Sequence, residues 1–152
     1  MRDLSESEAL DLVSGPLICE DAPGWTPINV QAGTVRLGAG VLDIDGTGTQ
    51  MYIELMYRRS QKTNTTTFLF TLFKRYSYGK DRVYQLEVTQ TPRRIKDQHK
   101  ISHEHMGSTR TVGDAVWASW GYDEVLAYFS ARTNIIFRPL PPHPEHFQLT
   151  GE

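Results

Sequence analysis

The feature that most constrains the fold is a succession of strand-like segments separated by short turn sequences between residues 28 and 90. The segments are rich in Val, Ile, Tyr, Phe and Thr, which strands favour, and the turn sequences are QAG, DGTG, SQKTN and SYGKD. Connections this short join antiparallel neighbours, because a parallel crossover needs a dozen residues or more. The sequence therefore predicts a meander of about five strands at 28–31, 34–45, 50–59, 66–76 and 82–90.

Alternation within two of these segments predicts which side chains share a face. In TFLFTLFKRY, one face carries Phe68, Phe70, Leu72 and Lys74, and the other carries Leu69, Thr71, Phe73 and Arg75. Both faces begin apolar, so this strand is expected at the centre of the sheet, with its basic end emerging from cover. In VYQLEVTQ, the apolar face carries Tyr84, Leu86 and Val88.

Two helices are expected to flank this sheet. Ser5 and Glu8 have the spacing of a capping box, and Gly15 with the following proline ends the first helix. The segment 122–134 fits a second helix with Asp123 as its N-cap and a buried stripe of Val125, Leu126 and Phe129. The intervening stretch 108–121, with two tryptophans, reads as another extended pair.

The whole chain, 1–152, is expected to form a single α+β domain. Its sheet would be mainly antiparallel, with five to seven strands and an N-terminal and a C-terminal helix, and 138–152 would be a proline-rich tail. The glycine-rich stretch LGAGVLDIDGTG lacks both phosphate-binding glycine patterns, so it is interpreted as strand, bulge and turn.

Cysteine content and hydropathy predict a cytoplasmic protein without a membrane partner. Cys19 is the single cysteine, so no disulfide can form within the chain. The N-terminal sequence MRDLSESEALDLV lacks the basic and apolar regions of a secretion signal. No apolar run approaches the ~20 residues that span a bilayer.

Charge is distributed unevenly, and the middle of the chain is basic. Between residues 58 and 100 there are eleven basic residues against three acidic ones, although the net charge of the chain is −2. Clustered Lys and Arg attract phosphates, and Tyr76, Tyr78 and Tyr84 among them could stack on bases. The alternative is that the charges solvate strand ends and the tyrosines pack across strands. Both interpretations remain open at this stage.

The stretch HKISHEHMG, residues 99–107, holds three of the five histidines. In an extended segment His103 and His105 share one face, while Glu104 points the other way. A cupin-like His-x-His metal strand would place a glutamate four or five positions later, where this chain has Thr109 and Arg110. No metal site and no cofactor are therefore predicted.

Acid–base chemistry without a metal is the second interpretation of the histidines. His103 and His105 could move the protons needed to cleave RNA by internal transfer, because imidazole titrates near neutrality. The predicted phosphate-binding residues are Arg93, Arg94, Lys100, Lys74 and Arg75. The competing interpretation is structural: His105 packs under the tryptophans and His99 is a solvated loop residue.

The C-terminal half resembles a group of small uncharacterised prokaryotic proteins associated with toxin–antitoxin loci. The resemblance covers residues 68–136 and rests on YQLEV at 84–88, Pro92, His103 with His105, Gly107, Trp117-Ala118, Leu126, Phe129, Asn134 and Ile135. It implies an α+β domain from a bacterium or phage, in a mobile or defence-related locus, and of the catalytic candidates it marks only His103 and His105. It implies no chemistry.

These observations lead to two functional hypotheses. The first is a small toxin–antitoxin or phage-defence protein that binds RNA, with metal-independent ribonuclease activity as an extension. The alternative is a non-catalytic phage or mobile-element inhibitor that binds a host protein complex through an exposed charged face.

Overall fold

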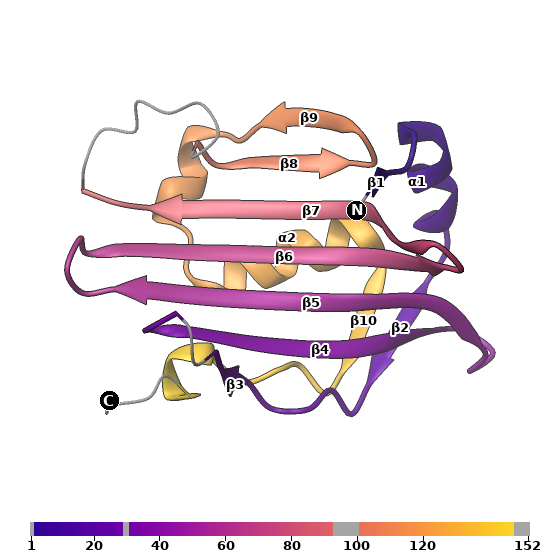
Figure 1. Cartoon of the computed structure of the whole chain (residues 1–152), viewed down its shortest axis with the longest axis horizontal. Helices are drawn as coiled ribbons and strands as arrows, with labels where there is room; N and C mark the ends of the chain where they lie inside the picture. The colour runs from indigo at the N-terminus through magenta and orange to yellow at the C-terminus, as the bar shows by residue number, and fades with distance from the viewer. Residues whose placement is uncertain (1, 29–30, 93–100, 148–152) are drawn as a thin grey trace.

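The computed structural model of the chain describes residues 2–28, 31–92 and 101–147. Its centre is one ten-stranded sheet with two α-helices (Figure 1). The strands are β1 (Arg2–Asp3), β2 (Leu17–Glu20), β3 (Thr26–Pro27), β4 (Thr34–Asp43), β5 (Gly48–Ser60), β6 (Thr65–Tyr76), β7 (Gly79–Gln90), β8 (His103–Met106), β9 (Thr109–Val112) and β10 (Ile135–Arg138). Their spatial order is β10-β2-β4-β5-β6-β7-β8-β9, with β1 beside β7 and β3 beside β4.

The predicted α+β domain with a sheet of five to seven antiparallel strands is wrong. The sheet has ten strands and is mixed, because β10 pairs in parallel with β2 and β1 pairs in parallel with β7. The additional strands are short: β1 and β3 have two residues each, and β2 has four. Pairing between β2 and β10 joins segments from opposite ends of the chain, so no local turn sequence announces it.

The long strands β4 to β7 form the antiparallel meander that the turn sequences predict. The alternation predicted in β6 is confirmed: Phe68, Phe70 and Leu72 are buried on the same face, which meets the helix. A bulge between Leu72 and Phe73 shifts the register against β7 by one residue. Of the first predicted strand, at 28–31, residues 29 and 30 lie outside the described residues, and the described strand next to it is β3 at Thr26–Pro27.

The helices α1 (Glu6–Leu12) and α2 (Tyr122–Thr133) lie where the sequence places them, but one cap differs. Ser5 and Glu8 form the expected capping box. The N-cap of α2 is Gly121 and not Asp123: the Glu124 carboxylate accepts the Gly121 backbone N–H at 2.6 Å. The N-cap therefore lies two residues earlier than predicted, and Tyr122, the first residue of the helix, is buried.

The tryptophan-containing stretch differs from its prediction in its second half. Its first part is β9, which pairs with β8, whereas Ala115–Ser119 is a 3₁₀ helix, η2, instead of a strand. Trp117 is buried and stacks on Trp120, so packing of the indole rings replaces strand pairing here.

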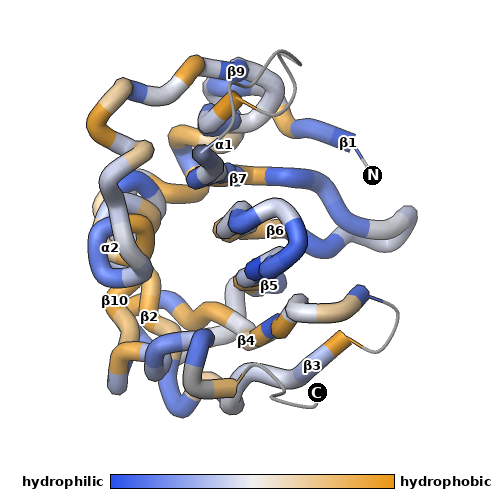
Figure 2. The backbone as a smooth tube through the Cα atoms, turned by 90° about the vertical axis from the view of Figure 1, so that its left-hand side faces the viewer, coloured by the Kyte–Doolittle hydropathy of each residue, from blue (hydrophilic) through white to orange (hydrophobic). Residues whose placement is uncertain are grey.

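Helix α2 covers one face of the sheet (Figures 1 and 2). Phe129 packs on Phe70 and Tyr84, and its neighbours Val125 and Leu126 are buried as predicted. Neither described α-helix lies over the middle of the opposite face, and neither is long and apolar enough to cross a membrane.

This opposite side, the open face, is defined by strand alternation from the helix-covered residues. Its members are Arg36, Gly38 and Gly40 on β4; Tyr52, Glu54, Met56 and Arg58 on β5; Thr67, Leu69, Thr71, Phe73 and Arg75 on β6; Lys80, Arg82, Gln85, Glu87 and Thr89 on β7; and His103, His105 and Arg110 on β8 and β9.

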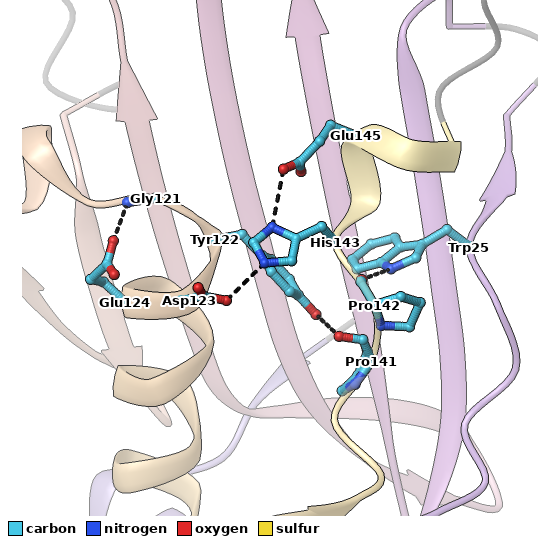
Figure 3. Close-up of polar contacts among 9 residues, drawn as sticks. All are labelled: Trp25, Gly121, Tyr122, Asp123, Glu124, Pro141, Pro142, His143 and Glu145. Carbon is cyan, nitrogen blue, oxygen red and sulfur yellow. Dashed lines mark hydrogen bonds and ion pairs between the residues drawn. The ribbon is translucent and has the colours of Figure 1, made fainter.

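The segment after β10, expected as a tail, is anchored to the domain over residues 139–147 (Figure 3). The Tyr122 hydroxyl donates to the Pro141 carbonyl at 3.0 Å, and the Trp25 indole N–H donates to the Pro142 carbonyl at 2.8 Å. The rings of Trp25 and Tyr122 also meet edge to face. Two aromatic side chains from distant segments therefore tie the C-terminal segment to the core.

Candidate functional site

Two glycines leave a hollow in the open face. Gly38 and Gly40 alternate along β4 with Leu37 and Val41, which are buried on the helix side. A Cβ added at Gly40 would meet no atom within 4 Å, and one at Gly38 would meet only the Ile53 carbonyl oxygen at 3.8 Å. Neither crowding nor a left-handed backbone requires glycine at these positions. Glycine weakens a strand interior, and it often marks a place where a ligand approaches the backbone closely.

The side chains around this hollow come from β4, β5 and β6. Register places Tyr52 directly opposite Gly40 and Glu54 directly opposite Gly38. We call the hollow the glycine groove, defined by Arg36, Gly38, Gly40, Tyr52, Glu54 and Arg75. The whole hollow, which extends beyond these six residues to Pro23 and Gly48, has a volume of about 770 Å³, within the ~300–1,000 Å³ typical of small-molecule sites.

Aromatic rings and cations lie together at the groove. Tyr52 stacks on Phe73 with ring centroids 5.3 Å apart, and the Arg75 guanidinium lies 4.9 Å from the centroid of the Tyr52 ring. The Lys80 ammonium lies 4.2 Å from the centroid of the Phe73 ring. Cations over ring faces are attracted by the aromatic quadrupole, and the same surfaces can stack on planar ligands.

Glu54 is the acidic residue of the groove. Its side chain is half-buried, and within the described parts of the chain it has no hydrogen-bond or ion-pair partner. Its two carboxylate oxygens are therefore available as acceptors, facing a hollow that also contains two guanidinium groups.

The structure brings the two candidate catalytic histidines together. His103 and His105 lie on β8 opposite Glu87 and Gln85, and their ring centroids are 5.0 Å apart. Both belong to the open face, as alternation predicts. Glu104, between them, points to the helix-covered side.

The environment of these histidines does not suit acid catalysis near neutral pH. His103 is 6% exposed, and its Nδ1 lies 2.5 Å from the Ile101 carbonyl oxygen. The Nδ1 of His105 is buried and has no hydrogen-bond partner among the described residues. Burial, with the charges of Arg82 and His103, lowers the pKa of His105 to about 4. His105 is therefore neutral at pH 7 and has no proton to donate as a cation.

Glu87, which lies opposite His103, also has its charged form disfavoured by burial. Burial raises the pKa of Glu87, while the nearby charges of His103 and Arg110 lower it. Glu87 and His105 thus lie in a partly desolvated part of the open face, where the charged forms of both side chains are disfavoured.

Glu104 is held by a hydrogen-bond network on the helix side. Its carboxylate accepts the hydroxyls of Tyr84 at 2.9 Å and Tyr128 at 2.6 Å, and it pairs with the Arg132 guanidinium at 2.9 Å. Burial and the adjacent Glu104 raise the pKa of Tyr128 to about 12. This network joins β8 to α2, so Glu104 is occupied structurally.

The tryptophans lie on the same side as Glu104. Trp117 and Trp120 pack on Tyr128, with ring centroids 5.2 and 5.3 Å from the Tyr128 centroid. They therefore contact the helix layer and do not cover His103 and His105, which lie on the opposite side of β8.

The predicted phosphate-binding residues are separated. Arg75 belongs to the glycine groove, whereas Lys74 points to the other face, where its ammonium donates to the Thr49 carbonyl at 2.8 Å. Arg93, Arg94 and Lys100 lie outside the described residues, as does His99.

The tyrosines considered for base stacking are engaged elsewhere. Tyr84 is fully buried beneath α2, and Tyr76 stacks on Tyr78, over which the Arg2 guanidinium lies. The tyrosine that lines the groove is Tyr52, whose ring is half-buried, stacks on Phe73 and lies beneath the Arg75 guanidinium; it was not among the tyrosines predicted to stack on bases. Its signal was the spacing: Gly-x-Gly at 38–40 followed by Tyr-x-Glu at 52–54, each at strand period on one face.

A second polar cluster lies at the start of α2 (Figure 3). The His143 ring bridges two carboxylates, with Nε2 3.1 Å from Asp123 and Nδ1 3.0 Å from Glu145. Because the carboxylates meet opposite ring nitrogens, the three groups do not converge on one point. In the described part of the chain, no three His, Cys, Asp or Glu side chains are arranged to hold a metal ion.

Comparison with known proteins gives no relative: no protein-family model, curated protein or solved structure matches this chain.

Proposed function

We propose that this protein binds single-stranded RNA on its open face and that the glycine groove receives one nucleotide. The observation that carries the proposal is the groove itself: a hollow floored by Gly38 and Gly40 and bordered by Tyr52, Arg36 and Arg75. Such a protein would fit the toxin–antitoxin or phage-defence class that the resemblance implies.

The dimensions and surfaces of the groove suit an unpaired base. Single-stranded nucleic acids are recognised by stacking on aromatic rings and arginine planes, and each stacked base contributes ~1–3 kcal/mol. Tyr52 supplies a ring beside the Gly40 floor, and Arg75 lies over that ring. A base that enters over Gly40 would stack on Tyr52 and would displace water, not core side chains.

Charge on the open face favours phosphate. Its cations are Arg36, Arg58, Arg75, Lys80, Arg82 and Arg110, and its acids are Glu54 and Glu87. Asp3 of β1 binds Arg82 through two hydrogen bonds of 2.8 Å, which leaves the other cations to outnumber the acids. A face with excess Lys and Arg attracts a polyanion and makes its affinity salt-dependent.

One row of side chains connects the groove with the histidines. Register aligns Glu54, Thr71, Gln85 and His105 on four adjacent strands, so Glu54 and His105 are about three strand spacings, ~14 Å, apart. Gln85 donates to Thr71 at 2.9 Å and accepts from Arg82 at 2.6 Å. A nucleic acid strand lying along this row would contact both regions.

Ribonuclease activity by His103 and His105 stays a prediction, and RNA binding does not depend on it. It is tested by incubating single-stranded RNA with the protein in EDTA. Cleavage that disappears in both His103→Ala and His105→Ala, with unchanged melting temperatures, would support it. RNA that stays intact would mean that the protein binds RNA without cleaving it.

The decisive test of RNA binding fills the groove. Gly40→Val adds a β-branched side chain to open space, so we expect unchanged or slightly higher thermal stability. We expect binding of a fluorescein-labelled single-stranded RNA of about ten nucleotides, measured by anisotropy at low salt, to weaken at least ~10-fold, which corresponds to loss of one stacked base.

A charge variant provides an independent measure. Arg75→Ala removes one phosphate contact and should reduce the slope of log K against log salt by ~0.7. Lys62→Ala is the matched control, because Lys62 is exposed in the turn at the far end of β5 and β6 and carries the same charge. Wild-type binding in Gly40→Val and Arg75→Ala would refute the proposal. A host protein captured by wild type but not by Gly40→Val, with no RNA bound, would favour the inhibitor hypothesis.

A further inference from the structure

We infer that the glycine groove selects guanine, through the carboxylate of Glu54. This inference rests on the proposed RNA binding and adds the base that the site prefers. It follows from three features of the groove: an acceptor without a partner among the described residues, its position relative to Tyr52, and the charge of the surrounding side chains.

The unpaired carboxylate is the first feature. In a site for a polyanion, an acid repels phosphate and costs affinity unless the ligand offers it hydrogen-bond donors. Glu54 has no donor from the described chain, although it lies on a face with many cations. A structural role as an ion-pair partner therefore does not explain it, whereas a role in accepting donors from the ligand does.

The position of Glu54 is the second feature. Tyr52 and Glu54 are two residues apart on one strand, so their side chains leave the same face ~7 Å apart. Gly40 lies opposite Tyr52 and Gly38 lies opposite Glu54, and the two glycines make a continuous floor. A base that stacks against Tyr52 over Gly40 would thus turn one edge toward Glu54 over Gly38.

The chemistry of the four bases then decides which edge fits. Guanine presents two adjacent donors, N1–H and the N2 amino group, and a carboxylate can accept both at once. Adenine and cytosine present one amino group next to an unprotonated ring nitrogen, whose lone pair faces the second carboxylate oxygen. Uracil presents one N–H between two carbonyl oxygens. Guanine therefore satisfies Glu54 fully, and uracil does so least.

The cations are the third feature, and they distinguish a nucleotide from a peptide. An arginine side chain would also offer two parallel donors to a carboxylate, but Arg36 and Arg75 line the same groove and would repel it. The phosphate of a guanine nucleotide would instead be attracted by both groups.

The test compares RNAs that differ in one base. Fluorescein-labelled oligouridylates of nine nucleotides, with G, A, C or U at the central position, are titrated with the full chain and binding is followed by anisotropy. We expect the G-containing RNA to bind ~10-fold to 100-fold more tightly than the U-only RNA, the discrimination of one bidentate base contact.

Glu54→Gln is the diagnostic variant, since it keeps the size of the side chain and removes one acceptor. We expect it to reduce the preference for G to less than about threefold, while binding of the U-only RNA is unchanged or improved through loss of a negative charge. Glu6→Gln on α1, an exposed acid on a helix that packs on β7 and β8 rather than on the strands of the groove, is the matched control and should retain the preference.

The outcomes separate the two proposals. RNA binding without a preference for G, or a preference that persists in Glu54→Gln, would overturn guanine selection and leave RNA binding intact. Absence of binding to all four RNAs at low salt would refute RNA binding itself. Should Glu54→Gln melt at a lower temperature, Gly38→Ala, which crowds the Glu54 side of the floor without a clash, must reduce the preference in its place.

Discussion

Replacing Glu104 by alanine should destabilise the protein substantially, although Glu104 is far from the groove. The substitution removes three acceptor contacts, to Tyr84, Tyr128 and Arg132. The largest cost comes from Tyr84, which is fully buried and would keep a hydroxyl without an acceptor, at ~1–3 kcal/mol. The side chain of Arg132 is 41% exposed and returns to water, so its loss is smaller.

Together with lost packing, these effects predict a decrease of about 3 kcal/mol in the free energy of unfolding. For a chain of this size the melting temperature should fall by ~6–12 °C. Differential scanning fluorimetry and urea titration measure the two quantities. Glu20→Ala, an exposed acid on β2, is the control and should change stability by less than ~0.5 kcal/mol.

A double-mutant cycle tests the physical reason as well as the size of the effect. Tyr84→Phe should cost ~1 kcal/mol in the wild type but nothing in the Glu104→Ala background, where it removes the orphaned hydroxyl. A melting temperature of Glu104→Ala within ~2 °C of the wild type, or additive effects in the cycle, would refute the assignment of the network as a structural connection between β8 and α2.

Two further predictions concern pH and backbone conformation. Burial, with nearby Arg82 and His103, lowers the pKa of His105 from its ordinary 6.5 to about 4, so the unfolded chain binds a proton that the folded chain excludes. The contribution of His105 to stability should therefore be full above pH ~6.5, and the free energy of unfolding should fall by ~1–2 kcal/mol toward pH 4, after allowance for solvent screening. Urea titrations at several pH values should show a shallower fall for His105→Asn than for the wild type. Equal slopes of unfolding free energy against pH in the two proteins would contradict the assignment. Gly107→Ala should cost ~2–4 kcal/mol, because φ is +57° and the new Cβ would lie 2.5 Å from the Leu4 carbonyl oxygen, whereas Gly15→Ala, with open space, should be nearly neutral in the same thermal melts.

Local sequence patterns were sufficient for the long antiparallel strands and for the helices. The β4 to β7 meander follows from strand-forming segments joined by short turns, because each of these strands pairs with the next one along the chain. The capping box at Ser5 and the buried stripe of Val125, Leu126 and Phe129 likewise depend on spacings of three and four residues. Alternation also placed His103 and His105 on one face and Glu104 on the other.

The size of the sheet depended on contacts that no local pattern encodes. Strands β1, β2 and β10 are short, and each is stabilised by a partner far away in the chain, which no local spacing identifies. The short helix η2 also depends on a tertiary contact, because Trp117 within it and Trp120 at its end pack on Tyr128 of α2. Tertiary packing overrides weak local preference in such segments.

The candidate site depended on register. Gly38, Gly40, Tyr52, Glu54 and Arg75 are ordinary strand residues in the sequence, and their spacing along the chain does not say which of them meet. Pairing of β4, β5 and β6 sets Tyr52 against Gly40 and Glu54 against Gly38, and it brings Arg75 of β6 over the Tyr52 ring. A shift of one residue would bury every one of these side chains on the helix side, because strand side chains alternate with a period of two. The residue types thus supplied the chemistry, and cross-strand register assembled it into a groove.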